Sequence, residues 1–432
     1  MAPAARGDGG RPAEAIVVGA GLAGLACAAD LAAHGLRVRL LEAADAVGGR
    51  VRTDLVQGFR LDRGFQVFNT AYPQVRRRFD LRALRLRPFT PGFLLGGARG
   101  DGAAARVRLA DPTRQPWQSG DLLAGRLARY PDLLVLAALS ARDLLLPAAA
   151  LRRTRDLPTG VALARAGLSR AAVDAVLRPF LAGVFLEDEL ETSSRFCHLV
   201  WRSMLRGTLC LPSTGIGAVP AQLAERLPPG VLRLESPVAQ LTGDGVLLAD
   251  GTELPAATVV VATEPAEAAR LLPGLRVPAG RAVSTFYHAA PRSPLREPTL
   301  LVDAGRQLLN TVVLTEVAPT LSGDGRALIA SSVLGLRAEE PRVRARLAEL
   351  YRTDTADWEE LAVHRIPAAL PARPAPQPLS RSTRFAPGRH VCGDHRATGS
   401  VQGALASGAR AAREVLADLA AGPTAPRPAG GR

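Results

Sequence analysis

The N-terminal part of the chain alternates short apolar runs with an apolar helical segment, as strands joined by a helix do. Residues 15–18 form an unbroken apolar run. The segment that follows carries Ala28 and Leu31 where a helix would face a sheet, and Gly35 ends it. Val38 and Leu40 then alternate in the manner of a second strand. The chain is therefore expected to begin with a strand–helix–strand unit.

A long central stretch has the spacing of helices. From Tyr72 to Trp201, apolar residues recur three and four positions apart, which predicts a mostly helical region. Residues 121–155 hold Leu-rich helices that are expected to break at Pro131 and Pro147. We interpret this region as a packed helical subdomain, with a face that dips into a membrane surface as the alternative.

Later parts of the chain carry strand patterns. Residues 238–241 and the turn at Asp250-Gly251 predict a hairpin. Residues 280–370 alternate apolar and polar positions, which predicts an antiparallel sheet. Residues 388–420 predict a strand, a glycine-rich turn and a last helix.

The turn after the first strand has the spacing Gly-x-Gly-x-x-Gly, formed by Gly19, Gly21 and Gly24. The first glycine permits the tight turn, the second lets a pyrophosphate approach the backbone, and the third lets helix and strand pack closely. The phosphates then lie at a helix N-terminus. Glu42 ends the second strand 18 residues past Gly24 (42 − 24), where its carboxylate can accept hydrogen bonds from ribose hydroxyls.

This pattern predicts a dinucleotide site, and no lysine follows the glycines, which excludes a nucleotide-triphosphate P-loop. The residues expected to form the site are Gly19, Ala20, Gly21, Leu22, Ala23, Gly24, Glu42 and Ala43.

After Glu42 the chain continues with Gly48-Gly49-Arg50, and here it resembles the flavin-dependent amine oxidase and phytoene desaturase superfamily. Further segments are similar to motifs of that family and keep its order: residues 61–67, 211–220, 259–265, 391–394 and 400–404. The resemblance implies FAD as the cofactor. The cysteine at the family's usual attachment site is absent, so we expect FAD to be bound noncovalently.

The resemblance implies an α/β fold, in which a Rossmann-like FAD-binding domain of the glutathione reductase type is interleaved with a substrate domain of helices and an antiparallel sheet. We place the FAD-binding domain at residues 14–71, 208–272 and 380–421, and the substrate domain at residues 72–207 and 273–379. Residues 1–13 and 422–432 are rich in Ala, Gly and Pro and are predicted to be disordered tails.

The resemblance also implies roles for single residues. Arg50 would lie beside the diphosphate, and Asp394 would bind the ribityl or phosphate part of FAD, with a turn or helix cap as its alternative role. Backbone N–H groups at Ser400, Val401 and Gln402 could stabilise negative charge on the reduced ring. The backbone of Val238 would pair with adenine. The other implied cofactor-binding residues are Gly49, Gly64, Phe65, Gln66, Val67, Thr263 and Gly393.

Two departures from true amine oxidases point toward the carotenoid and isoprenoid branch of the superfamily. The chain contains no lysine, which amine oxidases commonly place near the flavin, and Ser400 stands where they hold an aromatic residue. An apolar tunnel would serve a hydrophobic substrate, and the candidate lining residues, each of which could equally be core, are Phe65, Phe68, Phe185 and Phe286.

The flavin itself would take up the hydride or two electrons, so the protein needs no nucleophile activated by a base. Weak candidates for acid–base work are His395, His288 and Gln66, and a structural role is the alternative for each histidine. Four cysteines without metal-ligand spacing predict no metal site and suggest a reducing, cytoplasmic compartment.

Composition limits the partners. The 432 residues suffice for two or three domains, and the net charge of +14 comes from arginine alone. An arginine-biased genome explains this charge, and attraction to the anionic inner face of a membrane is the alternative. The arginines are scattered and only 4% of residues are aromatic, which argues against nucleic-acid binding. We expect a hydrophobic small-molecule substrate, and the oligomeric state is left open.

Three functions fit these observations. The first is an FAD-dependent dehydrogenase or desaturase that transfers hydride from a hydrophobic, isoprenoid-like substrate to flavin. The second is an amine oxidase or protoporphyrinogen oxidase that uses dioxygen. The third is a flavin-binding protein with a non-redox, isomerase-like role.

Overall fold

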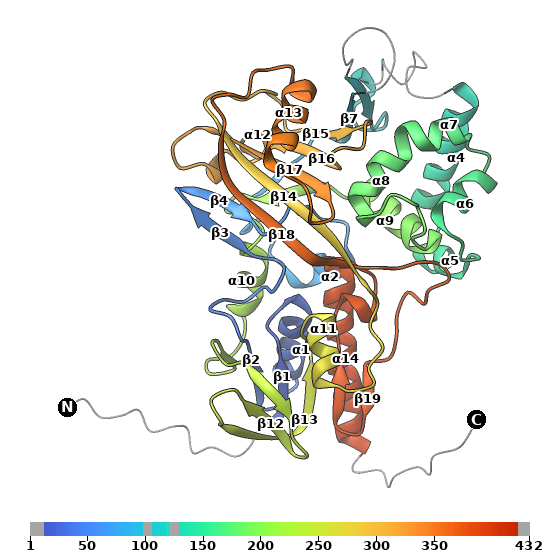
Figure 1. The fold of residues 1–432 in the computed structure, drawn as a ribbon. Helices are drawn as coiled ribbons and strands as arrows, with labels where there is room; N and C mark the ends of the chain where they lie inside the picture. Colours follow the sequence, from blue (N-terminus) through green and yellow to red (C-terminus); the bar gives the residue numbers. More distant parts are fainter. Residues whose placement is uncertain (1–12, 98–105, 119, 121–128, 422–432) are drawn as a thin grey trace.

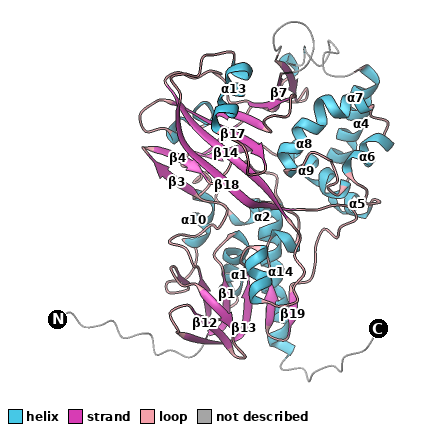
Figure 2. Cartoon of the chain, in the orientation of Figure 1, coloured by secondary structure: helices cyan, strands magenta, loops and turns pink. Residues whose placement is uncertain are grey.

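The structure is a computed structural model that describes residues 13–97, 106–118, 120 and 129–421 (Figure 1). The tails predicted to be disordered lie outside these residues, with one correction: Ala13 already begins the first strand. The Leu-rich residues 121–128 also lie outside them. The described chain forms two main sheets, with a group of helices beside the upper one (Figure 2).

The first sheet is built around a central parallel strand. β1 (Ala13–Val18) lies between β2 (Val38–Leu41) and the C-terminal part of β13 (Glu253–Val261), in parallel register with both. The sheet is completed by β10 (Leu232–Arg233), β11 (Val238–Leu241), β12 (Gly245–Leu248), β19 (Arg384–Ala386) and β20 (Arg389–Val391). The antiparallel pair β12–β13 turns at Ala249–Thr252, which confirms the hairpin expected at Asp250-Gly251.

Both faces of β1 are buried, as is usual for a strand of a parallel sheet. Ala15 and Val17 pack against α1 (Leu22–Ala33) and α14 (Val401–Ala421), while Ile16 and Val18 pack on the other face. The helices around this sheet also include α2 (Pro73–Arg78), α10 (Ala218–Ala224) and α11 (Pro265–Leu271). The sheet therefore joins segments that are far apart in the sequence. The domain boundaries drawn above stay a prediction.

The second sheet has seven strands in the order β18-β14-β17-β16-β15-β7-β8. Their bounds are Glu359–Pro371 (β18), Gly280–Ala290 (β14), Ala327–Leu334 (β17), Asn310–Val313 (β16), Leu300–Asp303 (β15), Gly92–Gly96 (β7) and Val107–Ala110 (β8). All neighbours are antiparallel except β15 and β7. The antiparallel sheet expected over residues 280–370 is thus present. Helix α13 (Glu340–Tyr351) packs on one face, and α12 (Leu314–Val317) contributes to the core on the other.

The expectation that residues 72–201 are mostly helical was wrong at its start. β6 (Leu86–Pro88), β7 and β8 lie within this stretch, and β7 pairs with β15 some two hundred residues further along the chain. A short, fully apolar run such as residues 93–95 shows neither the repeat of a helix nor that of a strand. Pairing with the distant β15 makes it a strand. Smaller strands and turns are β3 (Thr53–Val56), β4 (Phe59–Asp62), β5 (Phe68–Asn69), β9 (Leu209–Pro212), η1 (Pro116–Gln118), η3 (Pro319–Leu321) and η4 (Asp394–Arg396).

The remaining helices form a group beside the seven-stranded sheet (Figure 1). They are α4 (Tyr130–Leu145), α5 (Ala148–Arg153), α6 (Thr159–Arg165), α7 (Arg170–Ala172), the π-helical turn η2 (Val173–Leu177), α8 (Arg178–Phe185) and α9 (Ser194–Arg206). Pro147 separates α4 from α5 as expected, but Pro131 lies in the first turn of α4 rather than at a break. The first turn tolerates proline because its N–H groups have no partner within the helix.

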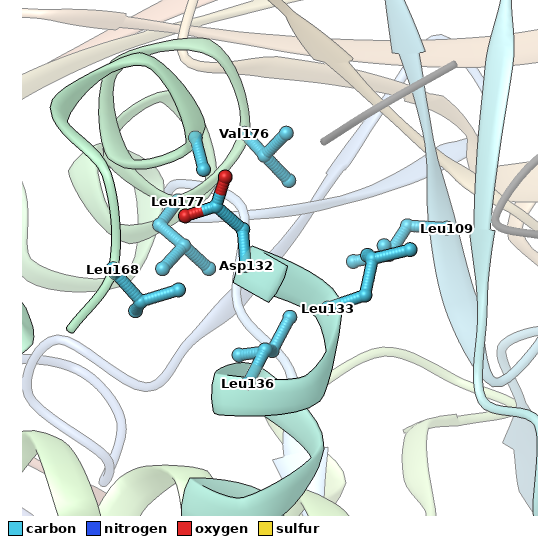
Figure 3. A pocket seen from close by; sticks show the side chains of 8 residues that line it. Leu109, Asp132, Leu133, Leu136, Leu168, Val176 and Leu177 are labelled. Carbon is cyan, nitrogen blue, oxygen red and sulfur yellow. The ribbon is translucent and has the colours of Figure 1, made fainter. Parts of the chain in front are cut away.

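A small apolar cavity of about 20 Å³ lies between α4 and η2 (Figure 3). Its one charged side chain, Asp132, accepts hydrogen bonds from the backbone N and Oγ of Ser169 at 2.7 and 2.9 Å. A cavity of this size holds about one water molecule, so it is a packing gap rather than a substrate site. Among the described helices, none is both long enough and apolar enough to cross a membrane.

The packing of α14 on α1 depends on Gly408. A Cβ atom at this position would lie 2.1 Å from the Ala23 carbonyl oxygen, which belongs to backbone and cannot move away easily. We therefore expect Gly408→Ala to lower the free energy of unfolding by about 1–3 kcal/mol, measured by denaturant titration.

Gly160 in α6 is the matched control, because a Cβ atom there would meet Leu190 at an ordinary 3.5 Å. Gly160→Ala should be neutral or stabilise the protein by up to about 1 kcal/mol, since alanine favours helices. Equal stability of the two variants would contradict this account of the helix contact.

Candidate functional site

The glycine-rich turn lies at the carboxyl end of β1 and leads into α1. Gly19 has φ +100°, and a Cβ atom on Gly24 would lie 1.9 Å from the Gly19 carbonyl oxygen, so both positions need glycine. Gly21 is the N-cap of α1 and provides no side-chain cap. A Cβ atom on Gly21 would have no neighbour nearer than the Gly48 carbonyl oxygen at 4.0 Å. The turn at Gly21 therefore offers both open space and the N–H groups of a helix N-terminus at the position where a phosphate is expected.

Glu42 closes this turn from the next strand. Its Oε2 accepts a hydrogen bond from the backbone N of Ala20 at 2.6 Å, and its Oε1 accepts one from Ala44 at 3.0 Å. A carboxylate oxygen can accept more than one hydrogen bond, so capacity remains for ribose hydroxyls. Glu42 thus holds the expected phosphate loop in addition to its expected role toward the ribose. Leu22 and Ala23 form the buried first turn of α1, while Ala43 is exposed next to Glu42.

The second glycine pair lies directly against the first turn. The Gly48 N–H donates to the Ala20 carbonyl at 2.9 Å, and Gly21 and Gly48 form a short parallel bridge. Gly49 follows with φ +59° and is exposed. The two loops that the sequence assigned to one pyrophosphate are therefore neighbours in space.

Arg50 connects this loop to the C-terminal signature. Its Nη2 donates to Asp394 Oδ1 at 2.7 Å, and its Nη1 donates to the Ala369 carbonyl at 2.6 Å. The charge of Asp394 raises the pKa of the guanidinium against the opposing effect of burial. Arg50 also borders a cavity of about 110 Å³ whose other lining residues are Pro265, Ala266, Val277, Pro278, Gly280, Ala368, Leu370 and Pro371. Arg50 provides the only charge in this otherwise apolar lining.

Gln66 is hydrogen-bonded to the loop that carries Arg50. Its Nε2 donates to the Arg50 carbonyl at 2.7 Å and to the Arg63 carbonyl at 3.2 Å, so both amide hydrogens are engaged. Gly64 has φ +85°, and a Cβ atom there would lie 2.8 Å from Ile366 Cδ1 in β18. Phe65 and Val67 pack against the apolar core between β4 and the seven-stranded sheet. The stretch 64–67 thus lies against the seven-stranded sheet, and its passage along the flavin ring stays a prediction.

The C-terminal signature begins α14. Ser400 Oγ accepts a hydrogen bond from Gly403 N at 3.1 Å, which makes Ser400 an N-cap. Val401 is the first residue of α14, and Gln402 Oε1 accepts a hydrogen bond from Gln74 N at 2.9 Å, which ties α14 to α2. The expected helix start at residues 400–402 is present. Whether its N–H groups stabilise a reduced ring stays a prediction.

His395 and His288 are both buried but lie in different surroundings. Neither ring nitrogen of His395 has a hydrogen-bond partner among the described residues, and burial lowers its pKa to about 4, so the ring is neutral at pH 7. Gly393, next to it, has φ +147° and no room for a side chain beside this ring. His288 instead contacts Glu340 on α13. The structure therefore keeps His395 beside Asp394 and separates His288 from that cluster.

Two further implied residues lie near the first sheet. Thr263 follows β13, and a Cβ atom on Gly19 would be 3.2 Å from its backbone N, so Thr263 borders the glycine-rich turn. Val238 is buried at the start of β11, and its carbonyl accepts a hydrogen bond from Arg270 Nη2 at 3.1 Å. Adenine pairing by Val238 stays a prediction.

The candidate lining phenylalanines do not form one tunnel. Phe68, Phe286 and Phe185 lie in three separate apolar clusters, and Phe65 packs against a fourth. Sequence spacing identified them as apolar but carried no information on which elements cover them, and most of them are core residues.

The sequence did not single out two charged residues at this site. Asp62 is buried, and its Oδ1 accepts hydrogen bonds from Thr53 Oγ1 at 2.6 Å and from Ile216 N at 2.9 Å. Burial raises its pKa to about 6 despite these bonds. Arg373 donates to the Asp394 carbonyl at 2.8 Å, and burial lowers its pKa to about 10. The Asp-Arg-Gly motif at residues 62–64 could have revealed Asp62, whereas no local signal marks Arg373.

Asp62 predicts a pH dependence of stability. Its carboxyl group titrates at 3.8 in the unfolded chain and at about 6 in the folded protein, so folding favours the protonated form. The protonated carboxyl therefore stabilises the fold fully below pH 3.8, and this stabilisation is lost as the pH rises through about 6. Asp62→Asn removes this titration. The free energy of unfolding of the variant, relative to that of the parent, should therefore rise by up to about 3 kcal/mol between pH 4 and pH 7.

The measurement is denaturant unfolding of both proteins across this pH range at equal cofactor saturation. Asp54→Asn is the control, because the hydrogen bond from Arg63 lowers the pKa of Asp54 and the expected trend is reversed. A constant difference between Asp62→Asn and the parent would show that the Asp62 carboxyl is not perturbed.

Comparison with known proteins agrees with this geometry. The profile of the flavin containing amine oxidoreductase family matches residues 22–416. A candidate protoporphyrinogen oxidase from Exiguobacterium sp. 255-15 superposes with a TM-score of 0.69 at 17% identity, covering 94% of this chain and 98% of that one. Cyclohexylamine oxidase from Brevibacterium oxydans superposes with a TM-score of 0.66 at 19% identity, covering 95% and 100%. At these identities the likeness shows a shared fold.

Curated relatives match over shorter stretches. An L-amino-acid oxidase from Bungarus fasciatus is 53% identical over 80 residues, which are 18% of this chain and 16% of that protein. Lysine-specific histone demethylase 1 homolog 1 from Arabidopsis thaliana is 51% identical over 51 residues, or 12% and 6%. The chain thus spans less than a fifth of the length of these relatives. With its family profile, FAD-type loops and fold taken together, the chain belongs to the flavin-containing amine oxidoreductases and is an FAD-dependent oxidoreductase.

Proposed function

We propose that this protein oxidises a hydrophobic, isoprenoid- or carotenoid-type compound by transfer of hydride from carbon to FAD. FAD, when bound, would accept the hydride, and the proton released as the new double bond forms would pass to solvent. The chain's own residues hold the cofactor, exclude water and position the substrate.

The residues around the glycine-rich turn fit FAD. The first turn of α1 offers backbone N–H groups beside Gly21, and Arg50 offers a guanidinium next to the same loop. Glu42, which borders the same turn, would accept hydrogen bonds from a ribose, and Asp394 is hydrogen-bonded to Arg50. A diphosphate would compete with Asp394 for Arg50, so we expect this ion pair to rearrange when FAD binds.

A cluster of small and branched apolar side chains beside Gly64 supports the substrate class. Ala182, Val283 and Leu309 are buried together, and Leu186, Ile366 and Ala369 pack against them. This cluster joins α8 to β14 and β18, and Ile366 is the side chain nearest to Gly64. An apolar substrate gains about 25 cal/mol per Å² of apolar surface that it buries in such surroundings.

The lack of lysine supports the same choice. An amine substrate needs groups that orient and deprotonate it over the flavin, and the chain has neither the lysine nor the aromatic residue at position 400 that amine oxidases use. Ser400 serves instead as the N-cap of α14.

Oxidation of an amine or a porphyrinogen with dioxygen is the second candidate. It is favoured by the fold shared with cyclohexylamine oxidase and with a structure of putrescine oxidase bound to putrescine, the latter at a TM-score of 0.64. The third possibility considered from the sequence, a non-redox role, does not agree with the family assignment.

Glu42 tests the cofactor site. Glu42→Ala removes a charge-assisted acceptor for ribose and the bond to Ala20 N, so FAD affinity should fall about tenfold to hundredfold. Glu42→Asp should have a smaller effect because it retains the carboxylate. The measurement is the flavin content after dialysis, with the released flavin titrated back.

Glu14→Ala is the matched control, since among the described residues the partly exposed Glu14 carboxylate is paired only with Arg37, by an ion pair at 3.7 Å and a hydrogen bond from the Arg37 backbone N at 3.0 Å. It should retain FAD like the parent. Unchanged flavin content in Glu42→Ala would exclude Glu42 as the ribose-binding acid.

Anaerobic flavin reduction tests the substrate class. Short primary amines and polyamines should not bleach the flavin band, because the chain lacks the groups that orient an amine. Long polyenes or hydroxylated terpenoids, delivered in detergent or liposomes, should reduce it. Rapid bleaching by an ordinary monoamine at micromolar to millimolar concentration would instead establish the amine oxidase reading.

A further inference from the structure

A histidine and two glutamates from three different elements meet at the upper end of the seven-stranded sheet. His288 lies on β14, Glu360 is its cross-strand partner on β18, and Glu340 is the first residue of α13. Each offers one ligand atom, and these atoms all lie within 4.8 Å of one another. In Figure 1, α13 lies at the opposite end of the molecule from α1 and α14, which carry the expected FAD loops.

The fold brings these side chains together for structural reasons. Cross-strand partners in a sheet project to the same face, so His288 and Glu360 lie side by side. Helix α13 covers that face, and Val343 and Leu347 pack in the same core as Phe286, two positions before His288. The start of α13 therefore places Glu340 over the histidine.

The charges of the cluster are unbalanced. Glu340 Oε1 is 3.1 Å from His288 Nε2 and accepts a hydrogen bond from Arg344 Nε at 2.5 Å. The second carboxylate, Glu360, has no opposite charge of its own among the ion pairs of the described residues. Two carboxylates and one guanidinium give the cluster a net negative charge beside the imidazole.

We propose that His288, Glu340 and Glu360 bind a divalent transition-metal ion, with zinc as the best match to one imidazole and two carboxylates. Zinc–ligand distances near 2.1 Å place the ligand atoms of a tetrahedral site about 3.4 Å apart. The contact between His288 and Glu340 already has this spacing, at 3.1 Å. Glu360 is exposed, so its side chain can move the short remaining distance and the fourth position is open to water.

The alternative to a metal site is that Glu340 only stabilises the start of α13, and this explains fewer of the contacts in the cluster. A carboxylate at the first turn of α13 is stabilised by the helix dipole, which explains Glu340 alone. It does not explain a second carboxylate held within 4.8 Å of the first and of a fully buried histidine. A bound cation offsets the repulsion between the two carboxylates and takes an imidazole nitrogen as its third ligand.

The site would join α13 to β14 and β18. Since these elements separate on unfolding, zinc should bind only the folded protein and stabilise it. This site belongs to the second sheet and shares no residue with the FAD loops or the apolar cluster beside Gly64.

The test uses untagged, FAD-loaded protein freed of metal by dialysis against a chelator. Micromolar zinc chloride should raise the midpoint of thermal unfolding by several degrees, and equilibrium dialysis followed by metal analysis should find one zinc ion per chain. Glu360→Gln, an exposed substitution that should fold normally, should abolish both effects and leave the flavin content unchanged.

Glu359→Gln is the matched control. Glu359 is the exposed neighbour that pairs with Arg326 at 2.7 Å and projects to the other face of β18, so this variant should retain zinc binding. Zinc that binds the parent and Glu360→Gln equally is adventitious and overturns the proposal. So does a parent protein that retains no zinc.

Discussion

Close approach of backbone to backbone at the carboxyl edge of the first sheet is the constraint on which the rest of this structure depends. Gly24 lets α1 start directly against the Gly19 carbonyl, and Gly408 lets α14 lie on α1 at Ala23. Side chains at these positions would force the helices apart. Both loops expected to hold the pyrophosphate follow from this contact, because Gly48 in turn bonds to the Ala20 carbonyl.

Around this edge, the charged groups are placed in pairs rather than alone. Arg50 bonds to Asp394, whose own carbonyl accepts from Arg373, and Glu42 accepts from two backbone N–H groups. Each of these groups would be costly to bury unpaired. Their present partners satisfy these groups. Asp62 is the exception, since burial outweighs its hydrogen bonds and raises its pKa.

The seven-stranded sheet carries two separate groups of side chains. Apolar side chains are buried together beside Gly64, and the far end of the sheet carries the His288 cluster under α13. The two ends are separated by the apolar core of the sheet. Chemistry at the flavin and the proposed metal contact are therefore independent properties of one scaffold.

The sequence by itself determined the parts that depend on local spacing. The glycines at 19, 21 and 24, the acid at position 42 and the Ser400 helix start follow from turn geometry and helix capping, and the family motifs implied FAD. Only the tertiary structure decided which distant residues meet. Arg50 and Asp394 are 344 positions apart, β7 pairs with β15, and the four phenylalanines lie in different clusters. Strand register and the covered face of each element set these contacts, and a local apolar pattern contains neither.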